Sequence, residues 1–178
     1  MTDGESVYYI CAELPPGPML IAATERGLCR LTLPGEDQDG FWSWLKRRWP
    51  AGRLCDDPGY FRSVVAALEA YFQGELRRFD LRLDLCATPF QRRVLREISA
   101  IPYGETSSYG RLAARLGQPH AARAVGAATG SNPLPIVIPC HRVIGAEGQL
   151  VGYGGGLALK VKLLRLEGHR IEGNKLIS

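Results

Sequence analysis

The chain has 178 residues, of which 46% are hydrophobic, so it can bury a core in one domain or in two small ones. No apolar run approaches the roughly 20 residues that cross a bilayer. Residues 1–10 carry acidic side chains in place of the basic segment of an export signal. We therefore expect an unprocessed cytoplasmic protein that makes no contact with a membrane.

The net charge of +4 is divided unevenly along the chain. Residues 1–86 hold 10 basic and 13 acidic side chains, a net charge of −3, whereas residues 87–178 hold 12 and 5, a net charge of +7. Ordinary surface variation can produce such a difference, but a basic half is also the natural candidate for binding a polyanion. The division falls where a strand-like run gives way to helical periodicity, so we predict two domains, 1–86 and 87–178.

The cysteines indicate reduced thiols. They are odd in number, widely spaced and free of any Cys-x-x-Cys pair, so the pattern predicts neither a disulfide framework nor a zinc cage. All three histidines lie in the second half, which leaves the first half without a histidine site. We expect no bound metal. The cysteines are Cys11, Cys29, Cys55, Cys86 and Cys140.

The first half has the pattern of a small antiparallel sheet with two helices. Turn formers separate its short apolar runs, and a later alternation of leucines predicts one more strand. The aromatic side chains of the first helix are better explained by core packing than by base stacking. The second helix should bury Phe61, Val64, Val65, Leu68 and Phe72. The predicted strands are residues 8–12, 19–24, 27–33 and 79–85, and the predicted helices are residues 38–48 and 59–73.

The second half begins with a helical pattern. Thr88 is a candidate N-cap, Pro89 suits the first turn, and Pro102 ends the pattern. Thr106 or Ser107 should cap a second helix that ends at Leu116, with Tyr109, Leu112 and Ala113 facing inward. A third helix, residues 120–129, consists almost entirely of small residues.

The second and third of these helices have the pattern of a helix-turn-helix unit. Two short helices joined by a glycine-containing turn can present the second helix to a DNA groove, and small residues allow a close approach. A tightly packed helical hairpin explains the same pattern. Arg123 favours the first interpretation, because a single long cation on an alanine-rich helix suits a groove or a vacated base position.

Residues 132–144 contain the best candidate for a chemical centre. Prolines at 133, 135 and 139 stiffen the segment that leads to Cys140 and His141. A helical turn that begins at Cys140 would lower the thiol pKa, and the adjacent imidazole could accept the proton. A buried structural cysteine is the alternative. The position between a helix-turn-helix and a glycine-rich loop favours a nucleophile.

The sequence Pro139 to Val143 resembles the active-site signature of the O6-alkylguanine-DNA alkyltransferases. The resemblance is specific over residues 88–170 and rests on general shape over the first half. It implies an α+β fold, with a small ribonuclease-H-like domain followed by a mostly helical, winged helix-turn-helix-like domain. The further matching motifs are residues 101–106, 108–109, 121–126, 132–133, 152–157 and 166–168.

The resemblance implies catalytic roles for five residues. Cys140 resembles the nucleophile and alkyl acceptor, His141 the water-linked base, and Glu167 the acid that orients and charges this histidine. Asn132 resembles the hinge that ties the cysteine turn in place. Tyr109 resembles the tyrosine that crowds the target phosphate and donates a proton toward the departing guanine. By residue type alone, Glu167 could be a solvated helix end and Tyr109 a core residue.

The glycine loop resembles the family's guanine pocket. Tyr153, Gly154 and Gly155 would close it, with the N–H of Gly154 bonded to O6. The carbonyls of Cys140 and Val143 would accept from the exocyclic amine. Some family members carry a hydroxyl residue where this chain has Gly154, which leaves the preferred alkyl size open. A hairpin would also explain three consecutive glycines.

On the DNA side, Arg123 matches the side chain that replaces the flipped nucleotide. Flipping is needed because a sulfur atom cannot reach the alkyl carbon in line within the base stack. Tyr109, Gln118 and Gln91 fall near family contacts to DNA. The implied partner is duplex DNA that carries O6-alkylguanine, with O4-alkylthymine as a second candidate substrate.

The resemblance implies a suicide transferase that acts once and needs no cofactor, since the lesion supplies the alkyl group and water cannot displace a thioether. We take a monomer as the default expectation, because the sequence does not indicate the oligomeric state. Three other functions remain open at this stage. A non-enzymatic lesion binder would lack the acceptor cysteine, and a Cys/His/Glu hydrolase would turn over. A sequence-reading regulator would need side chains that reach base edges, whereas the presumed recognition helix offers mostly alanine.

Overall fold

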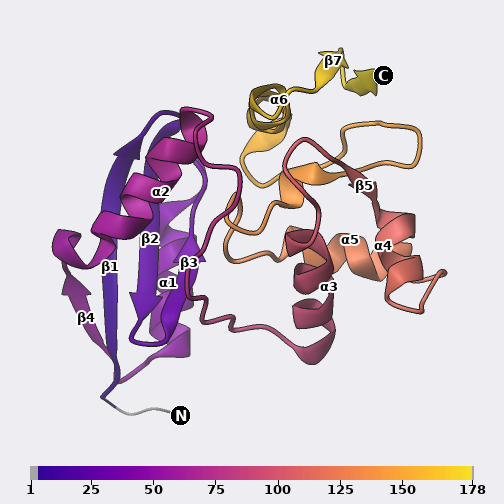
Figure 1. Ribbon diagram of the computed structural model, residues 1–178. Helices are drawn as coiled ribbons and strands as arrows, with labels where there is room; N and C mark the ends of the chain where they lie inside the picture. Colours follow the sequence, from indigo (N-terminus) through magenta and orange to yellow (C-terminus); the bar gives the residue numbers. More distant parts are fainter. Residues whose placement is uncertain (1–3, 178) are drawn as a thin grey trace. The chain divides into compact units, whose positions relative to one another are not determined.

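A computed structural model describes residues 4–177, and the chain divides into two units, Met1–Cys86 and Ala87–Ser178 (Figure 1). Residues 1–3, which belong to the stretch expected to lack an export signal, lie outside the described part. Within the described part, no helix is both long and apolar enough to cross a membrane.

The first unit is built on a four-stranded sheet in the order β3-β2-β1-β4. The three predicted antiparallel strands are confirmed, but β4 was missed and pairs with β1 in parallel, so the sheet is mixed. Residues 53–56 carry no buried side chain, and this strand therefore lacks the alternation that would have identified it. The strands are β1 (Ser6–Leu14), β2 (Gly17–Thr24), β3 (Gly27–Leu31) and β4 (Arg53–Asp56).

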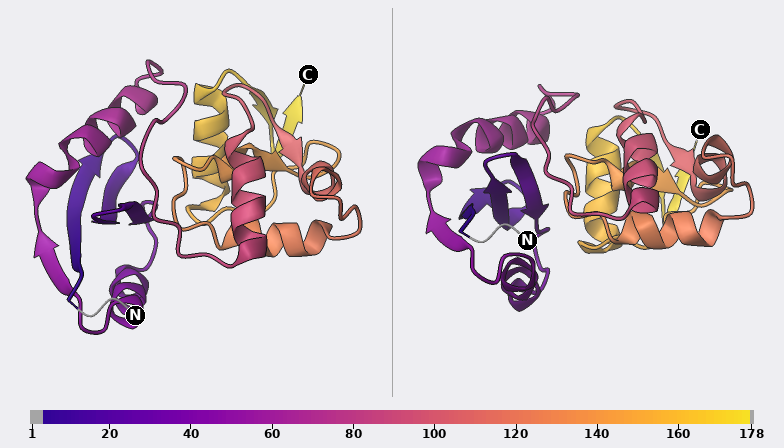
Figure 2. Two further views of the ribbon diagram at one scale, coloured as in Figure 1. Left: turned by 60° about the horizontal axis from the view of Figure 1, so that its bottom comes forward. Right: turned by 90° about the horizontal axis from the view of Figure 1, so that it is seen from below.

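Helices cover the two faces of this sheet, with α1 (Gln38–Arg48) on one and α2 (Arg62–Phe72) on the other (Figure 2). The predicted bounds of α1 are confirmed, and the side chain of Asp37 caps it. The second predicted helix is divided, because a 3₁₀ turn, η1 (Pro58–Phe61), precedes α2. Val65 and Phe72, both expected to be buried, are only half-buried, and Tyr71 is buried instead.

The strand predicted at residues 79–85 is wrong. A single bridge joins Leu83 to Leu28, through bonds from Leu28 N to Arg82 O (2.9 Å) and from Asp84 N to Leu28 O (2.7 Å). The segment is held instead by side chains, because the Asp84 carboxylate accepts from the Thr24 hydroxyl and pairs with Arg26. The leucines of this alternation are only half-buried, and the segment meets β3 at one bridge without a hydrogen-bonded ladder.

The first part of the second unit contains three short helices, with the strand β5 (Ser107–Ser108) between the first two of them (Figure 1). Thr88 caps α3 as predicted, in a reciprocal capping box with Gln91. The cap of α4 is Ser108, not Thr106 or Ser107, because the Ser108 hydroxyl accepts from Arg111 N at 3.2 Å. The helices are α3 (Pro89–Ser99), α4 (Tyr109–Arg115) and α5 (Ala122–Gly130).

The rest of the second unit places the cysteine turn among short elements. Strands β5 (Ser107–Ser108) and β6 (Val143–Ile144) pair in parallel, and the 3₁₀ turn η2 (Cys140–Arg142) leads directly into β6. Helix α6 (Gly156–Leu166) follows the glycine loop. A closing hairpin of β7 (Arg170–Glu172) and β8 (Lys175–Ile177) packs Ile171 with Ile144, Leu150 and Leu164.

Candidate active site

The segment that precedes the cysteine is tied into a closed turn. The Asn132 amide donates to Ile138 O at 2.9 Å, and its oxygen accepts from Leu134 N at 3.0 Å. Ile136 is buried with a φ of 73°, a conformation that a β-branched residue adopts only when its surroundings impose it. Asn132 thus acts on the backbone just before Cys140, where a hinge residue was expected.

Cys140 opens the turn η2 and is buried, with 7% of its surface exposed. Pro139 stands at the N-cap position, so the geometry agrees with the expected helical start at the cysteine. Burial of this kind protects a thiol from bulk oxidants and requires a substrate to enter the protein interior to reach sulfur.

The next two residues form a buried cluster with Glu167. The His141 ring nitrogen Nε2 lies 2.8 Å from Glu167 Oε1, and neither side chain is exposed. Arg142 donates to both carboxylate oxygens, through Nε and an Nη, each at 2.9 Å. Its other Nη donates to Ile101 O at 2.6 Å. Glu167 is therefore part of the interior and not a solvated helix end.

These contacts favour a neutral imidazole. Burial lowers the pKa of His141, and the hydrogen bond and charge of Glu167 oppose this shift. Arg142 and Lys160 reinforce the lowering through their positive charges. A neutral ring that donates Nε2–H to Glu167 presents Nδ1 as its basic nitrogen, which is the state that a proton acceptor needs.

The motif at residues 101–106 supports the same carboxylate. The Tyr103 hydroxyl donates to Leu166 O at 2.8 Å, and Gly104 N lies 3.4 Å from Glu167 Oε2. The Arg142 guanidinium lies over the Tyr103 ring, 5.8 Å from its centroid. The motif thus holds the end of α6 in place, and Glu167 with it.

Tyr109 and Cys140 belong to one electrostatic neighbourhood. Tyr109 is the first residue of α4, and a Cβ atom built on Gly126 would lie 3.8 Å from its ring. Burial raises the pKa of Tyr109, and the negative charge of Cys140 raises it further. The phenol therefore stays protonated at neutral pH and can act as a donor.

The glycine loop places Tyr153 beside the histidine and leads into α6. The Tyr153 and His141 rings lie 6.5 Å apart and nearly perpendicular. Gly154 is exposed, and Gly155 is the N-cap of α6, so the first backbone N–H groups of this helix lie in the loop. The Val143 carbonyl, expected to accept from guanine, already accepts from Lys160 Nζ at 2.7 Å, although a carbonyl can accept twice.

Four residues were expected to contact DNA, and the three besides Tyr109 differ in their surroundings. Arg123 is exposed on the first turn of α5 and forms no ion pair within residues 4–177. Gln118 is exposed in the turn between α4 and α5. The Gln91 side chain is engaged within the protein, because it completes the capping box and donates to Ser131 Oγ at 3.0 Å. Gln91 thus has a clear structural role.

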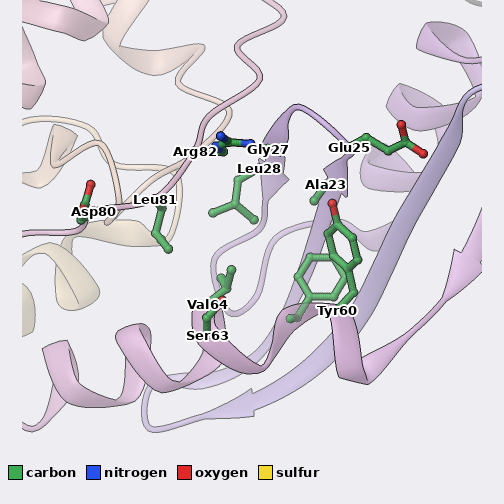
Figure 3. A pocket seen from close by; sticks show the side chains of 11 residues that line it. Ala23, Glu25, Gly27, Leu28, Tyr60, Ser63, Val64, Asp80, Leu81 and Arg82 are labelled. Atoms are coloured by element: carbon green, nitrogen blue, oxygen red, sulfur yellow. The ribbon is translucent and has the colours of Figure 1, made fainter.

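The described residues contain no other comparable site. No group of three metal-ligating side chains is found among residues 4–177. The first unit has a hollow of about 370 Å³ between the β2–β3 turn, the start of α2 and residues 80–82. Figure 3 shows the side chains that line it. Its walls carry Glu25, Asp80 and Arg82 but neither cysteine nor histidine.

Comparison with known proteins agrees with this geometry. The family model "6-O-methylguanine DNA methyltransferase, ribonuclease-like domain" matches residues 7–85, and the DNA binding domain of the same family matches residues 89–169. The chain belongs to the 6-O-methylguanine DNA methyltransferase family. The predicted family, the α+β fold class and the methyltransferase activity in DNA repair are therefore confirmed.

Members of the family from distant organisms resemble the chain over most of its length. Methylated-DNA–protein-cysteine methyltransferases from Mycobacterium tuberculosis and Methanosarcina acetivorans are 45% and 43% identical to it, over 92% and 91% of this chain and 94% and 99% of theirs. A structure of the M. tuberculosis protein in complex with DNA superposes with a TM-score of 0.77 at 44% identity, covering 91% of this chain and 92% of that one.

Two buried cations of this methyltransferase were missed by sequence reasoning. Arg142 directly follows the Cys-His pair. The only indication of its burial in the sequence is that it is a charged residue within a mostly apolar motif. Lys160 precedes Leu163 by three residues and Leu164 by four, and this helical spacing places it on the buried face of α6. Long basic side chains on helices usually extend to solvent, which is why neither residue was predicted to lie inside.

Proposed function

We propose that this methyltransferase transfers alkyl groups from O6 of guanine in duplex DNA irreversibly to its own Cys140. One observation carries the proposal: Cys140 opens a buried turn whose next residue, His141, lies 2.8 Å from the buried carboxylate of Glu167. A nucleophile, a base and an orienting acid in this order suit the activation of a thiol.

The reaction is an in-line displacement at the alkyl carbon. A bond forms between Cys140 Sγ and this carbon as the bond from carbon to O6 breaks, and the electron pair goes to the guanine. The thiol proton passes to His141 through a water molecule, and the Tyr109 hydroxyl donates a proton to the departing base. His141 then restores the Tyr109 proton through solvent, so the net change moves one proton from sulfur to guanine.

The loop before α6 is suited to stabilising the leaving guanine. Backbone N–H groups of Gly154 and Gly155 at the start of a helix favour negative charge on O6. Tyr153 would form a wall of the pocket. The carbonyls of Cys140 and Val143 would accept from the exocyclic amine, with Val143 using its second lone pair beside Lys160.

Base flipping follows from the burial of the nucleophile. Because Cys140 is 7% exposed, a base that remains stacked in the duplex cannot bring its alkyl carbon to sulfur. Helix α5 offers small residues and the exposed Arg123, which would occupy the vacated position in the duplex, with Tyr109 and Gln118 alongside. The M. tuberculosis relative in complex with DNA supports this partner. Binding should weaken steeply with salt.

Two variants separate binding from transfer. Cys140→Ala should bind an O6-methylguanine duplex with unchanged affinity in fluorescence anisotropy and accept no methyl group. Arg123→Ala should bind and repair more weakly while Cys140 reacts with iodoacetamide at the normal rate. Arg170→Ala, which changes an exposed arginine on β7, is the matched control. A Cys140→Ala protein that still accepted methyl groups would contradict the mechanism.

A further inference from the structure

The β7–β8 hairpin is bonded to the segment that leads into the glycine loop. Leu150 N donates to Asn174 O at 2.7 Å, and Leu176 N donates to Gly148 O at 2.9 Å. An antiparallel bridge lies between these two bonds. Residues 148–150 therefore pair with the hairpin as a short third strand, and the loop expected to close the guanine pocket begins at the next residue.

The bond to Gly148 uses a backbone group that the hairpin itself leaves unused. Ile171 is the partner of Leu176 in the β7–β8 register, and the next pair, Glu172 and Lys175, closes the turn. In an antiparallel pair, opposite residues alternately exchange hydrogen bonds and point their backbone groups away from each other. The N–H of Leu176 points away from β7, because it donates to Gly148. This bond can therefore be removed without breaking a bond between β7 and β8.

Gly148 is suited to this close approach of two backbones. Its φ is +84°, in the left-handed region, and a Cβ atom built on it would lie 3.2 Å from Leu176 O and 3.8 Å from Leu176 Cβ. Two further bonds close the turn before it, from Gly145 N to Gln149 O at 2.8 Å and from Gly148 N to Gly145 O at 3.1 Å. A side chain at position 148 would push this turn away from the hairpin.

Buried apolar side chains join the hairpin to the elements that carry the active site. One cluster contains Ile144, Leu150, Leu164 and Ile171. Ile144 belongs to β6, which follows the cysteine turn, and Leu164 lies on α6 just before Glu167. The start of the glycine loop is thereby held against the same frame as Cys140 and Glu167.

The composition of the glycine loop explains why it needs support at both ends. Residues 152–156 contain four glycines, and Gly152 and Gly156 have positive φ values of 30° and 82°. Glycine loses more conformational freedom on ordering than any other residue, so a loop of this composition is costly to fix when a base enters. Helix α6 holds the far end of the loop, and the hairpin holds the near end.

We propose that residues 148–150 and 174–176 form a clamp that holds the glycine loop ready to receive the flipped guanine, with Gly148 and Leu176 as its positioning residues. The proposal rests on the proposed function in taking this loop as a wall of the guanine pocket. A loop that is fixed beforehand loses less conformational freedom when the base binds, so the clamp increases the affinity for the lesion. The contacts of α5 with the duplex do not depend on it.

The first test compares binding to two duplexes in the Cys140→Ala background, in which no transfer occurs. Leu176→Pro removes the N–H that donates to Gly148 and places the proline ring against the same carbonyl. We expect the preference for an O6-methylguanine duplex over an unmodified duplex, measured by fluorescence anisotropy, to fall about tenfold. The affinity for the unmodified duplex should stay unchanged. Gly148→Ala should lower the preference in the same way.

Two companion variants separate the backbone bond from the side chains. Leu176→Val keeps the N–H group and should restore the parent preference, and Arg170→Ala, which changes an exposed side chain on β7, should leave it unchanged. Iodoacetamide should label Cys140 at the parent rate in a Leu176→Pro protein that retains this cysteine. An unchanged lesion preference or a slower reaction of Cys140 would overturn the proposal. An equal loss of affinity for both duplexes would also overturn it, since that result describes a purely structural hairpin.

Hydrogen exchange followed by NMR needs no substitution in the clamp and covers the case in which Leu176→Pro fails to fold. In the Cys140→Ala protein, the amides of Leu150 and Leu176 should exchange much more slowly than those of an unstructured chain. A saturating O6-methylguanine duplex should slow both about tenfold further, and the unmodified duplex should slow them less. Exchange at the rate of an unstructured chain, or the same slowing by both duplexes, would overturn the proposal.

Failure of this inference and failure of the proposed function are distinguishable. The clamp is tested by binding and exchange, so a lesion preference that survives Leu176→Pro leaves alkyl transfer to Cys140 intact. A protein whose lesion preference depends on the clamp but which takes no methyl group from DNA would contradict the proposed function alone.

Discussion

Replacing Glu167 with glutamine probes the buried cluster beside the nucleophile. The substitution keeps the size of the side chain but removes the negative charge of the carboxylate. This carboxylate accepts two hydrogen bonds from Arg142 and contacts the His141 ring. The glutamine side chain also places an NH₂ group, a hydrogen-bond donor, where one carboxylate oxygen accepted from the guanidinium of Arg142. The variant thus leaves a buried arginine, with 7% of its side chain exposed, without its counter-ion.

The expected loss of unfolding free energy is large for a substitution that replaces a single heavy atom. Removing one partner of a buried ion pair costs about 3–5 kcal/mol. Arg142 keeps its bond to Ile101 O, which favours the lower end of this range, about 3 kcal/mol. For a chain of this size, this corresponds to a melting temperature lower by about 6–12 °C.

Urea unfolding followed by far-UV circular dichroism measures this loss. All three tryptophans lie in residues 1–86, so their fluorescence reports separately on the first unit. Glu172→Gln, which changes an exposed glutamate five residues further along, should stay within about 0.5 kcal/mol of the parent protein.

A double-mutant cycle identifies the cause of the loss. Arg142→Met should cost far less in the Glu167→Gln background than in the parent, with a coupling energy of about 2–3 kcal/mol. A loss below about 1 kcal/mol for Glu167→Gln, or additive costs in the cycle, would refute the assignment of a stabilising buried pair.

Two further predictions concern the cysteine turn. Asn132→Ala should lower the free energy of unfolding in urea by about 2 kcal/mol, because Ile138 O and Leu134 N lose their hydrogen-bond partner. The variant should also slow methyl transfer in a quench assay. Transfer at the unaltered rate would contradict the role of Asn132 as a hinge. The pKa of His141 is lowered on folding, so the unfolded chain takes up the proton first, and unfolding free energy should fall as the pH drops below 6.5. His141→Gln should flatten this dependence between pH 7.5 and 5.5, although His169, whose pKa burial also lowers, contributes a part; an identical slope in both proteins would be contrary evidence.

Local signals in the sequence predicted the elements that local forces determine. The bounds of the helix at residues 38–48 and the N-cap at Thr88 were correctly predicted because they depend on neighbours within a few residues. The strand predicted at residues 79–85 failed because a ladder requires a partner far along the chain, and β3 offers backbone groups to it only at Leu28. The exposed strand β4 gave no signal for the same reason.

The active site was predictable as far as motifs extend. The resemblance assigned Cys140, His141 and Glu167, and the structure brings the last two into contact across 26 positions of sequence separation. Arg142 and Lys160 were missed because their burial depends on carbonyls and a carboxylate supplied by distant segments. Only the folded chain reveals that two basic side chains lie inside.

Intact-mass spectrometry after mixing the protein with excess duplex that contains O6-methylguanine tests the central claim most directly. We predict a gain of about 14 Da, one methyl group, that stops at one equivalent and maps to Cys140. Tight binding to the lesion without a mass change, or demethylation of more than one equivalent of DNA per protein, would contradict stoichiometric transfer to this cysteine.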